Sequence, residues 1–205
     1  MDDAHQQLTR IVTPVYPAGD TVDWPAAAAG LGVTGFPADY WEFVTRFGAG
    51  SLDDSLFVWV PRPGRPTEPL TVGRLPEDTL RAVEMARRRD PAAGSRYVLA
   101  DMLVWGQSTG GDALCWVTGA PDPERWPVAV WARQWGGWSV HDCGMAEFLV
   151  RLLRADFQAC PLSDATLWGE GTARFLNFRD EERLRDEGID PWTGEPDPFA
   201  GMEFD

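Results

Sequence analysis

A glycine-rich stretch, Gly106-Gln107-Ser108-Thr109-Gly110-Gly111-Asp112, has the composition of a phosphate-binding loop. Such a loop also needs a Lys-Ser/Thr pair and a helix that begins directly after it. The stretch lacks that pair, and strand patterns flank it on both sides. Ser108 fits the Gly-x-Ser-x-Gly spacing of a nucleophile elbow, but that motif likewise requires a helix after the serine. We therefore expect a turn between two strands, with no catalysis at Ser108.

His141 and Cys143 are the other pair with the residue types of a reactive site. On a strand they would share a face, which could seed a Cys-His centre. His5 is the only other histidine, however, and both metal binding and thiol activation need further partners. With Cys115 and Cys160 the chain has three cysteines, an odd number, and their spacing is not that of zinc ligands. We therefore expect the thiols to be reduced and mostly buried.

Carboxylates are numerous, but no pair of them is set apart by an apolar surrounding in the sequence. A glycosidase-like or general acid-base site depends on such a surrounding to separate two carboxyl pKa values. The sequence therefore predicts a protein that is not an enzyme, with no catalytic, cofactor-binding or metal-binding residues and no cofactor.

The acidic residues are concentrated toward the C-terminus. Ten of the 32 lie between Asp180 and Asp205, where Arg183 and Arg185 are the only basic residues, so this segment carries −8 of the total charge of −14. One interpretation is a solvated helix followed by a frayed end, because charge runs commonly keep a surface hydrated. The other is an acidic arm that binds a basic partner. The candidate partner-binding residues are Asp180, Glu181, Glu182, Asp186 and Glu187.

The overall composition excludes several classes of function. With 18 basic against 32 acidic residues in 205, the chain lacks the surplus of cations that phosphate neutralisation requires, so no nucleic acid is expected as a partner. The longest uncharged run, residues 24–38, is interrupted by proline and glycine and is shorter than the ~20 apolar residues of a membrane helix. The acidic start does not resemble a secretory signal. We expect a cytoplasmic protein without membrane contact, and we leave its oligomeric state open.

Helix signals occur in residues 3–12, 23–29, 37–47, 76–89 and 145–156. Asp23 followed by Pro25 is typical of a capped helix start. Aromatic and aliphatic residues at helical spacing give the segment 37–47 one apolar face, and Gly48 follows as a stop. The last helix has an apolar stripe that should cover a sheet.

Strand signals occur in residues 55–60, 97–105, 112–117, 127–132 and 137–141. The last four predict a meander of antiparallel neighbours. The order of elements predicts an α+β fold: a single largely antiparallel sheet, built mainly from residues 96–141, with the helices at 37–47 and 145–156 packed against it. The predicted core residues are Phe43, Phe47, Val104, Leu114, Trp116, Val130, Phe148 and Leu152.

Six of the eleven tryptophans lie in or beside this meander, at positions 105, 116, 126, 131, 135 and 138. Most of them should belong to the core, while an exposed minority would resemble a protein-binding surface. The chain is expected to consist of an α+β domain at residues 1–160 and an acidic C-terminal extension at 161–205. Phe175, Phe178 and Trp192 would pack this extension partly on the domain.

The stretch from Gly35-Phe36-Pro37-Ala38-Asp39-Tyr40-Trp41-Glu42-Phe43 to Phe47-Gly48-Ala49-Gly50 resembles the opening signature of the SUKH superfamily, the Smi/Knr-like proteins. The later segments are similar to the same family in order and spacing, over roughly residues 22–157. They are Leu103-Val104-Trp105-Gly106, the turn to Gly111-Asp112, Leu114-Cys115-Trp116, the strand at 128–131 and Phe148-Leu149. Phe36 before the proline, the turn Ser108-Thr109-Gly110-Gly111 and residues 161–205 depart from the family pattern.

The resemblance implies an α+β domain and, for bacterial members, an immunity protein that binds and blocks a polymorphic toxin, frequently a nuclease. The expected partner is then a basic protein toxin, to which an acidic inhibitor would be steered by charge. The alternative that the resemblance leaves open is an intracellular regulatory scaffold without a toxin partner.

Overall fold

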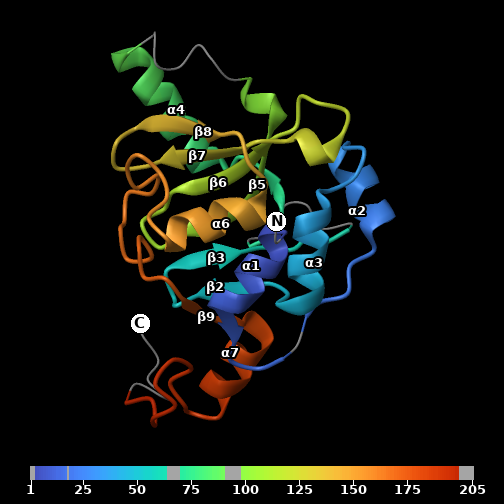
Figure 1. The fold of residues 1–205 in the computed structure, drawn as a ribbon. Helices are drawn as coiled ribbons and strands as arrows, with labels where there is room; N and C mark the ends of the chain where they lie inside the picture. Colours follow the sequence, from blue (N-terminus) through green and yellow to red (C-terminus); the bar gives the residue numbers. More distant parts are fainter. Residues whose placement is uncertain (1–2, 18, 64–69, 91–97, 199–205) are drawn as a thin grey trace.

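The computed structural model describes residues 3–17, 19–63, 70–90 and 98–198. In this part of the chain, six α-helices pack with one mixed, mostly antiparallel nine-strand open sheet (Figure 1). The predicted class, an α+β fold with a single largely antiparallel sheet, is confirmed.

Every segment with helix signals contains a helix, and one further helix lies in the acidic tail. The helices are α1 (Ala4–Ile11), α2 (Trp24–Leu31), α3 (Ala38–Arg46), α4 (Glu77–Arg89), α6 (Met145–Leu153) and α7 (Phe178–Asp186). The Asp23 carboxylate accepts from the Ala26 amide at 3.1 Å, which confirms the predicted cap of α2. Gly48 follows α3 with a left-handed φ of 74°, the conformation that a glycine stop supplies.

The strands are β1 (Val12–Pro14), β2 (Gly50–Leu52), β3 (Leu56–Val58), β4 (Gly73–Arg74), β5 (Met102–Ser108), β6 (Ala113–Val117), β7 (Val128–Ala132), β8 (Gly137–His141) and β9 (Ala173–Asn177). Their order in the sheet is β1-β9-β2-β3-β5-β6-β7-β8, and β4 pairs with β5 outside this path. Strands β5 to β8 form the predicted antiparallel meander. The predicted start of the first of them at Tyr97 lies outside the described residues.

Helices α1, α3 and α6 lie together over one face of the sheet (Figure 1). Tyr40 of α3 packs edge-on against Trp116 of β6, with ring centroids 4.8 Å apart, and Phe148 of α6 packs against Trp105 of β5 at 6.4 Å. All eight predicted core residues are buried. Burial of apolar rings of this size is the main favourable contribution to folding.

The tryptophans of the meander belong mostly to this core, as predicted. Trp105, Trp116, Trp126 and Trp131 are buried, and Trp138 is half-buried. Trp135, at the β7–β8 turn, is the exception with 74% of its side chain exposed.

The C-terminal extension supplies an internal strand of the sheet. Strand β9 pairs in parallel with β1 and antiparallel with β2. Phe175 of β9 is buried and meets Phe43 edge-on at 5.4 Å. The boundary expected at residue 160 thus separates residues that share one sheet and one core. Within the described residues, no helix has the length and hydropathy needed to cross a bilayer.

Candidate partner-binding site

The glycine-rich stretch forms the turn between β5 and β6, as the sequence predicts. The Gly111 amide donates to the Ser108 carbonyl at 2.9 Å, which closes the turn. Ser108 is buried, and its hydroxyl donates to Asp112 Oδ2 at 2.9 Å. Ser108 therefore holds the turn together from inside the protein.

Asp112 is fully buried and connects three separate segments. Besides Ser108, its carboxylate accepts from the Arg133 amide at 2.8 Å. It also accepts from Ser163, through the amide at 2.8 Å and the hydroxyl at 2.5 Å. A buried charge persists when hydrogen bonds replace its lost hydration, and four donors do so here. Asp112 thus joins the β5–β6 turn, the β7–β8 turn and the segment after α6.

His141 and Cys143 lie close in the chain but make separate contacts. The His141 ring is 3.0 Å from the Ser139 hydroxyl and packs on Phe157 with centroids 4.7 Å apart. Burial, followed by the charge of Arg151, lowers the pKa of His141. Among the described hydrogen bonds none joins the His141 ring to the Cys143 thiol. In the described residues, no group of three or more His, Cys, Asp or Glu could hold a metal ion.

The Cys143 thiol is expected to be unreactive near neutral pH. Burial is the main cause that raises its pKa to about 11, so the nucleophilic thiolate is scarce at pH 7. Alkylation of Cys143 by iodoacetamide, followed by peptide mass spectrometry, should accelerate with pH until about 11. A rate that is already maximal at pH 8 would contradict this and reopen the Cys-His hypothesis.

Helix α7 positions the acidic candidate residues. Its start is capped by the Asn177 side chain, which accepts from the Arg179 amide at 3.0 Å. Leu184 is buried and fixes the rotation of the helix. Side chains three or four positions apart share a helix face, so the five candidate carboxylates divide into two groups.

The first group, Asp180 and Glu187, points toward Arg183. The Arg183 guanidinium lies 3.5 Å from Asp180 and 3.1 Å from Glu187, and it also lies over the Tyr16 ring at 5.1 Å. These two carboxylates are therefore already paired within the helix. Such exposed i,i+3 and i,i+4 pairs contribute only tenths of a kcal/mol to stability.

The second group, Glu181, Glu182 and Asp186, lines a groove of about 600 Å³ between α7, the β2–β3 hairpin and the segment that follows β3. The full lining is Asp54, Phe57, Arg62, Leu70, Phe178, Glu181, Glu182, Arg185 and Asp186. Phe57 and Phe178 form an aromatic contact beneath it, with ring centroids 6.1 Å apart. We name this feature the α7 groove: an apolar base with carboxylates around it.

The charges around the α7 groove are not equally available. Glu181 is bound by Arg185, with its carboxylate 2.8 Å from Nη2, and only 15% of its side chain is exposed. Glu182 and Asp186 are exposed and take part in no ion pair in the described part of the chain. Burial, then the neighbouring Glu181, raises the pKa of Asp54, while Arg185 opposes the shift. The groove therefore carries unsatisfied negative charge.

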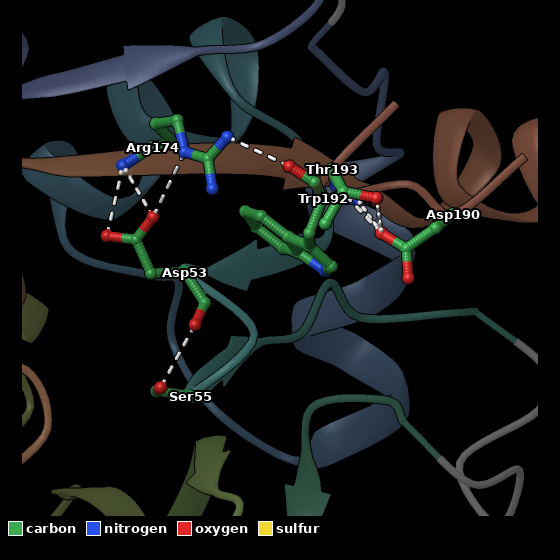
Figure 2. A network of polar contacts seen from close by, with 6 residues as sticks. All are labelled: Asp53, Ser55, Arg174, Asp190, Trp192 and Thr193. Carbon is green, nitrogen blue, oxygen red and sulfur yellow. Dashed lines mark hydrogen bonds and ion pairs between the residues drawn. The ribbon is translucent and has the colours of Figure 1, made fainter. Parts of the chain in front are cut away.

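A polar network around Asp53, the residue before Asp54, ties the β2–β3 hairpin to β9 (Figure 2). Asp53 and Asp54 both have left-handed φ angles, 41° and 53°, which aspartate tolerates better than most residues. The Asp53 amide donates to the Arg174 carbonyl at 3.0 Å, and its carboxylate lies 3.4 Å from Arg174 Nε. Arg174 in turn donates to the Trp192 carbonyl at 3.1 Å and lies over its ring. The hairpin wall of the groove is thus tied to β9.

The far end of this network is a compact turn after α7 (Figure 2). One carboxylate oxygen of Asp190 accepts from the Trp192 amide at 2.9 Å and from the Thr193 amide at 2.8 Å. The Thr193 hydroxyl donates to the same oxygen at 2.9 Å. Backbone hydrogen bonds lower the pKa of Asp190. Asp190 thus serves the turn and is not part of the groove.

The fold and site define the class: an α+β protein with an acidic groove over aromatic side chains. Comparison of the chain with protein-family models, with curated proteins and with solved structures finds no match.

The sequence analysis named three of the residues that line the groove, Glu181, Glu182 and Asp186, but it did not predict the groove itself. Phe178, Glu181, Glu182 and Arg185 follow the i, i+3, i+4, i+7 spacing of one helix face, a signal that was present in the sequence. Asp54 carried no such signal, because it comes from a hairpin more than 100 residues earlier.

Proposed function

We propose that this chain is a non-catalytic immunity protein that neutralises a polymorphic bacterial toxin by protein-protein contact in the cytoplasm. The observation that carries the proposal is the α7 groove, where four carboxylates outnumber the two arginines, Arg62 and Arg185, around an apolar base. The resemblance to the SUKH superfamily supports the same function. The partner is a basic protein toxin of nuclease type.

The groove suits a basic segment of a protein better than a free cation. Arginine and lysine carry long aliphatic stems that pack on apolar surface while their charged ends remain hydrated or paired. Phe57 and Phe178 supply that surface, and Glu182 and Asp186 supply the opposite charge at its margin. An arginine over an aromatic ring gains a further cation-π attraction.

The unpaired carboxylates favour binding of a cation for a second reason. Glu182 and Asp186 are four positions apart on α7, and like charges at this spacing destabilise an isolated helix by roughly 0.2 to 0.5 kcal/mol. A basic side chain placed between them removes this repulsion. A nuclease has such side chains in the channel that binds its substrate, so the same contact would block that channel.

Co-expression tests the proposed function directly. The gene next to that of this chain is examined for a toxin, and the toxin domain is expressed in a host with and without this chain. Rescue of growth is the expected result. A complex that forms without rescue of growth would contradict neutralisation of the toxin. The absence of any complex with the toxin would also contradict the proposal and would favour the regulatory scaffold, which has no toxin partner.

Reversing the two free charges, by Glu182→Lys together with Asp186→Lys, is expected to slow association with the toxin by on the order of tenfold at low salt. Electrostatic steering acts on the association rate, so the salt dependence of that rate should also weaken. Stopped-flow fluorescence over a range of ionic strength measures both quantities.

The matched control is Asp180→Lys with Glu187→Lys, which changes the net charge of α7 equally but on the face that contacts Arg183. The control should keep most of the association rate. Equal losses in the two variants would mean that total charge, and not the α7 groove, governs binding. If neither variant changes the association rate, the acidic tail only keeps the surface hydrated.

A further inference from the structure

Strand β8 forms one edge of the nine-strand sheet, and that edge is open. Among the described residues, β8 pairs with β7 on one side and with no strand on the other. All five of its residues are half-buried, whereas every residue of β7 is buried. Apart from the pairing with β7, the backbone groups of residues 137–140 make no hydrogen bond in the described part of the chain. β8 therefore presents free amide and carbonyl groups along its outer side.

The sequence of β8 has none of the features that prevent pairing with another strand. Proteins protect exposed edges with charged side chains, prolines or bulges. β8 reads Gly-Trp-Ser-Val-His, with no carboxylate, arginine, lysine or proline, and its register with β7 runs without a shift. The opposite edge strand, β1, has only three residues and ends in Pro14. Of these two edges, β8 is the one suited to receive a further strand.

A second copy of the same strand is complementary to β8. In an antiparallel pair about a twofold axis, each residue contact occurs twice, once from each copy. The register that pairs all five residues has Ser139 on the axis. It places Trp138 opposite Val140 of the second copy, and an aromatic beside a β-branched side chain is a favourable cross-strand pair. Gly137 then comes opposite His141, so no two carboxylates or arginines face each other along the strands.

The ends of β8 add charge complementarity. In Figure 1, the last turns of α4 extend past β8. A Cβ atom on Gly136, directly before β8, would lie 3.6 Å from Ala86 of α4, and the exposed Arg89 is one turn further along this helix. In the register about Ser139, Gly136 comes opposite the exposed Asp142 of the second copy. Each copy therefore brings a carboxylate to the basic end of α4 in the other.

Exposed apolar side chains lie in the same region. Trp135, in the β7–β8 turn, has 74% of its side chain exposed, and Met85, next to Ala86 on α4, has 54% exposed. Pairing brings the β7–β8 turn of each copy beside the end of β8 in the other, which covers part of this surface. Tryptophan is enriched among the residues that contribute most to protein-protein binding.

The net charge of −14 opposes this contact only weakly. Helix α7, where the acidic segment begins, lies at the opposite end of the molecule from β8 (Figure 1). Exposed charges separated by more than a Debye length, about 8 Å at physiological salt, are largely screened. The α7 grooves of two paired copies would therefore lie at the outer ends of the pair, and both would remain open to a partner.

We propose that β8 pairs in antiparallel orientation with β8 of a second copy of this chain, about a twofold axis at Ser139. The two sheets then form one continuous sheet across the contact. This inference does not depend on the proposed toxin, because the α7 groove and β8 share no residue.

Disulfide trapping tests the register. Opposite residues of an antiparallel pair have Cα atoms about 4.5 to 5.5 Å apart, a separation that a disulfide can bridge. Ser139→Cys, treated with oxidised glutathione, should give a covalent dimer on a non-reducing gel. Thr13→Cys, exposed on the other edge strand β1, should remain monomeric on that gel, as should the unaltered chain with its three free cysteines. Cross-linking of both variants alike, or of neither, would overturn the proposal.

Sedimentation equilibrium of the full chain measures the dimer without a cross-link. Arg89→Glu should weaken the dimer by about tenfold, because it opposes two like charges at each end of the contact, and adding Asp142→Arg should restore it. Arg46→Glu, exposed on α3, makes the same charge change away from β8 and should alter the dissociation constant by less than about twofold. A chain that stays monomeric at every concentration, or a charge exchange that restores nothing, would overturn the proposal.

Discussion

A chain that ends at residue 160 is expected to lose the cooperative unfolding transition of the full protein. The truncation removes β9, which lies between β1 and β2 in the sheet, and leaves the edges of both strands unpaired. It also removes Phe175, whose ring fills the core beside Phe43 and Phe47 at 5.4 Å from each. Urea titration followed by tryptophan fluorescence and circular dichroism measures the transition.

Two point variants distinguish the effect of losing the packing of β9 from the effect of shortening the chain. Phe175→Ala should lower the free energy of unfolding by about 3 to 5 kcal/mol, the cost of a large cavity in a packed core. Thr172→Ala, exposed just before the same strand, should change it by less than about 0.5 kcal/mol. Cooperative unfolding of the 1–160 fragment would instead establish the boundary that the sequence predicts.

Replacing Asp112 with alanine is expected to lower the free energy of unfolding by roughly 3 to 5 kcal/mol. The substitution leaves the buried donor of Ser108 and the part-buried donors of Arg133 and Ser163 without this acceptor. A buried donor that loses its acceptor costs about 1 to 3 kcal/mol, and the part-buried donors add less because water can reach them. Asp112→Asn should lose less, because its amide retains one oxygen acceptor. Chemical denaturation of the purified variants gives these values.

The matched control for this effect is Asp142→Ala, which removes an exposed carboxylate near the end of β8. Its free energy of unfolding should stay within about 0.5 kcal/mol of the unaltered chain. A similar loss in both variants would show that the buried network has no special importance for stability.

The meander and its covering helices could be predicted because their signals are local. Strands β6, β7 and β8 are each bounded by turn residues, and α6 has an apolar stripe that needs no distant information. Strands β1, β2 and β9 could not be predicted in the same way. Each has three to five residues, and their pairing joins segments from both ends of the chain, which only tertiary packing specifies.

The candidate site was predictable to the same extent. The concentration of carboxylates in α7 is a property of composition, so the sequence indicates it. The division of that charge by Arg183 and Arg185 requires the helix, and the apolar base requires Phe57 from a distant hairpin. Phe178 shares a helix face with the acidic residues and could be placed from the sequence, whereas Phe57, which completes the apolar base, could not.

The parallel pairing of β1 with β9 also sets an order of events during synthesis. Val12 pairs with Ala173, so the first strand leaves the ribosome about 160 residues before its partner exists. At the ~5 to 20 residues per second of translation, β1 lacks its neighbour for roughly ten to thirty seconds, and one edge of β2 lacks its neighbour for roughly six to twenty-five seconds. Unpaired strand edges invite pairing with other chains. We therefore expect the N-terminal half of the chain to be most prone to pairing with other chains while the protein is being synthesised.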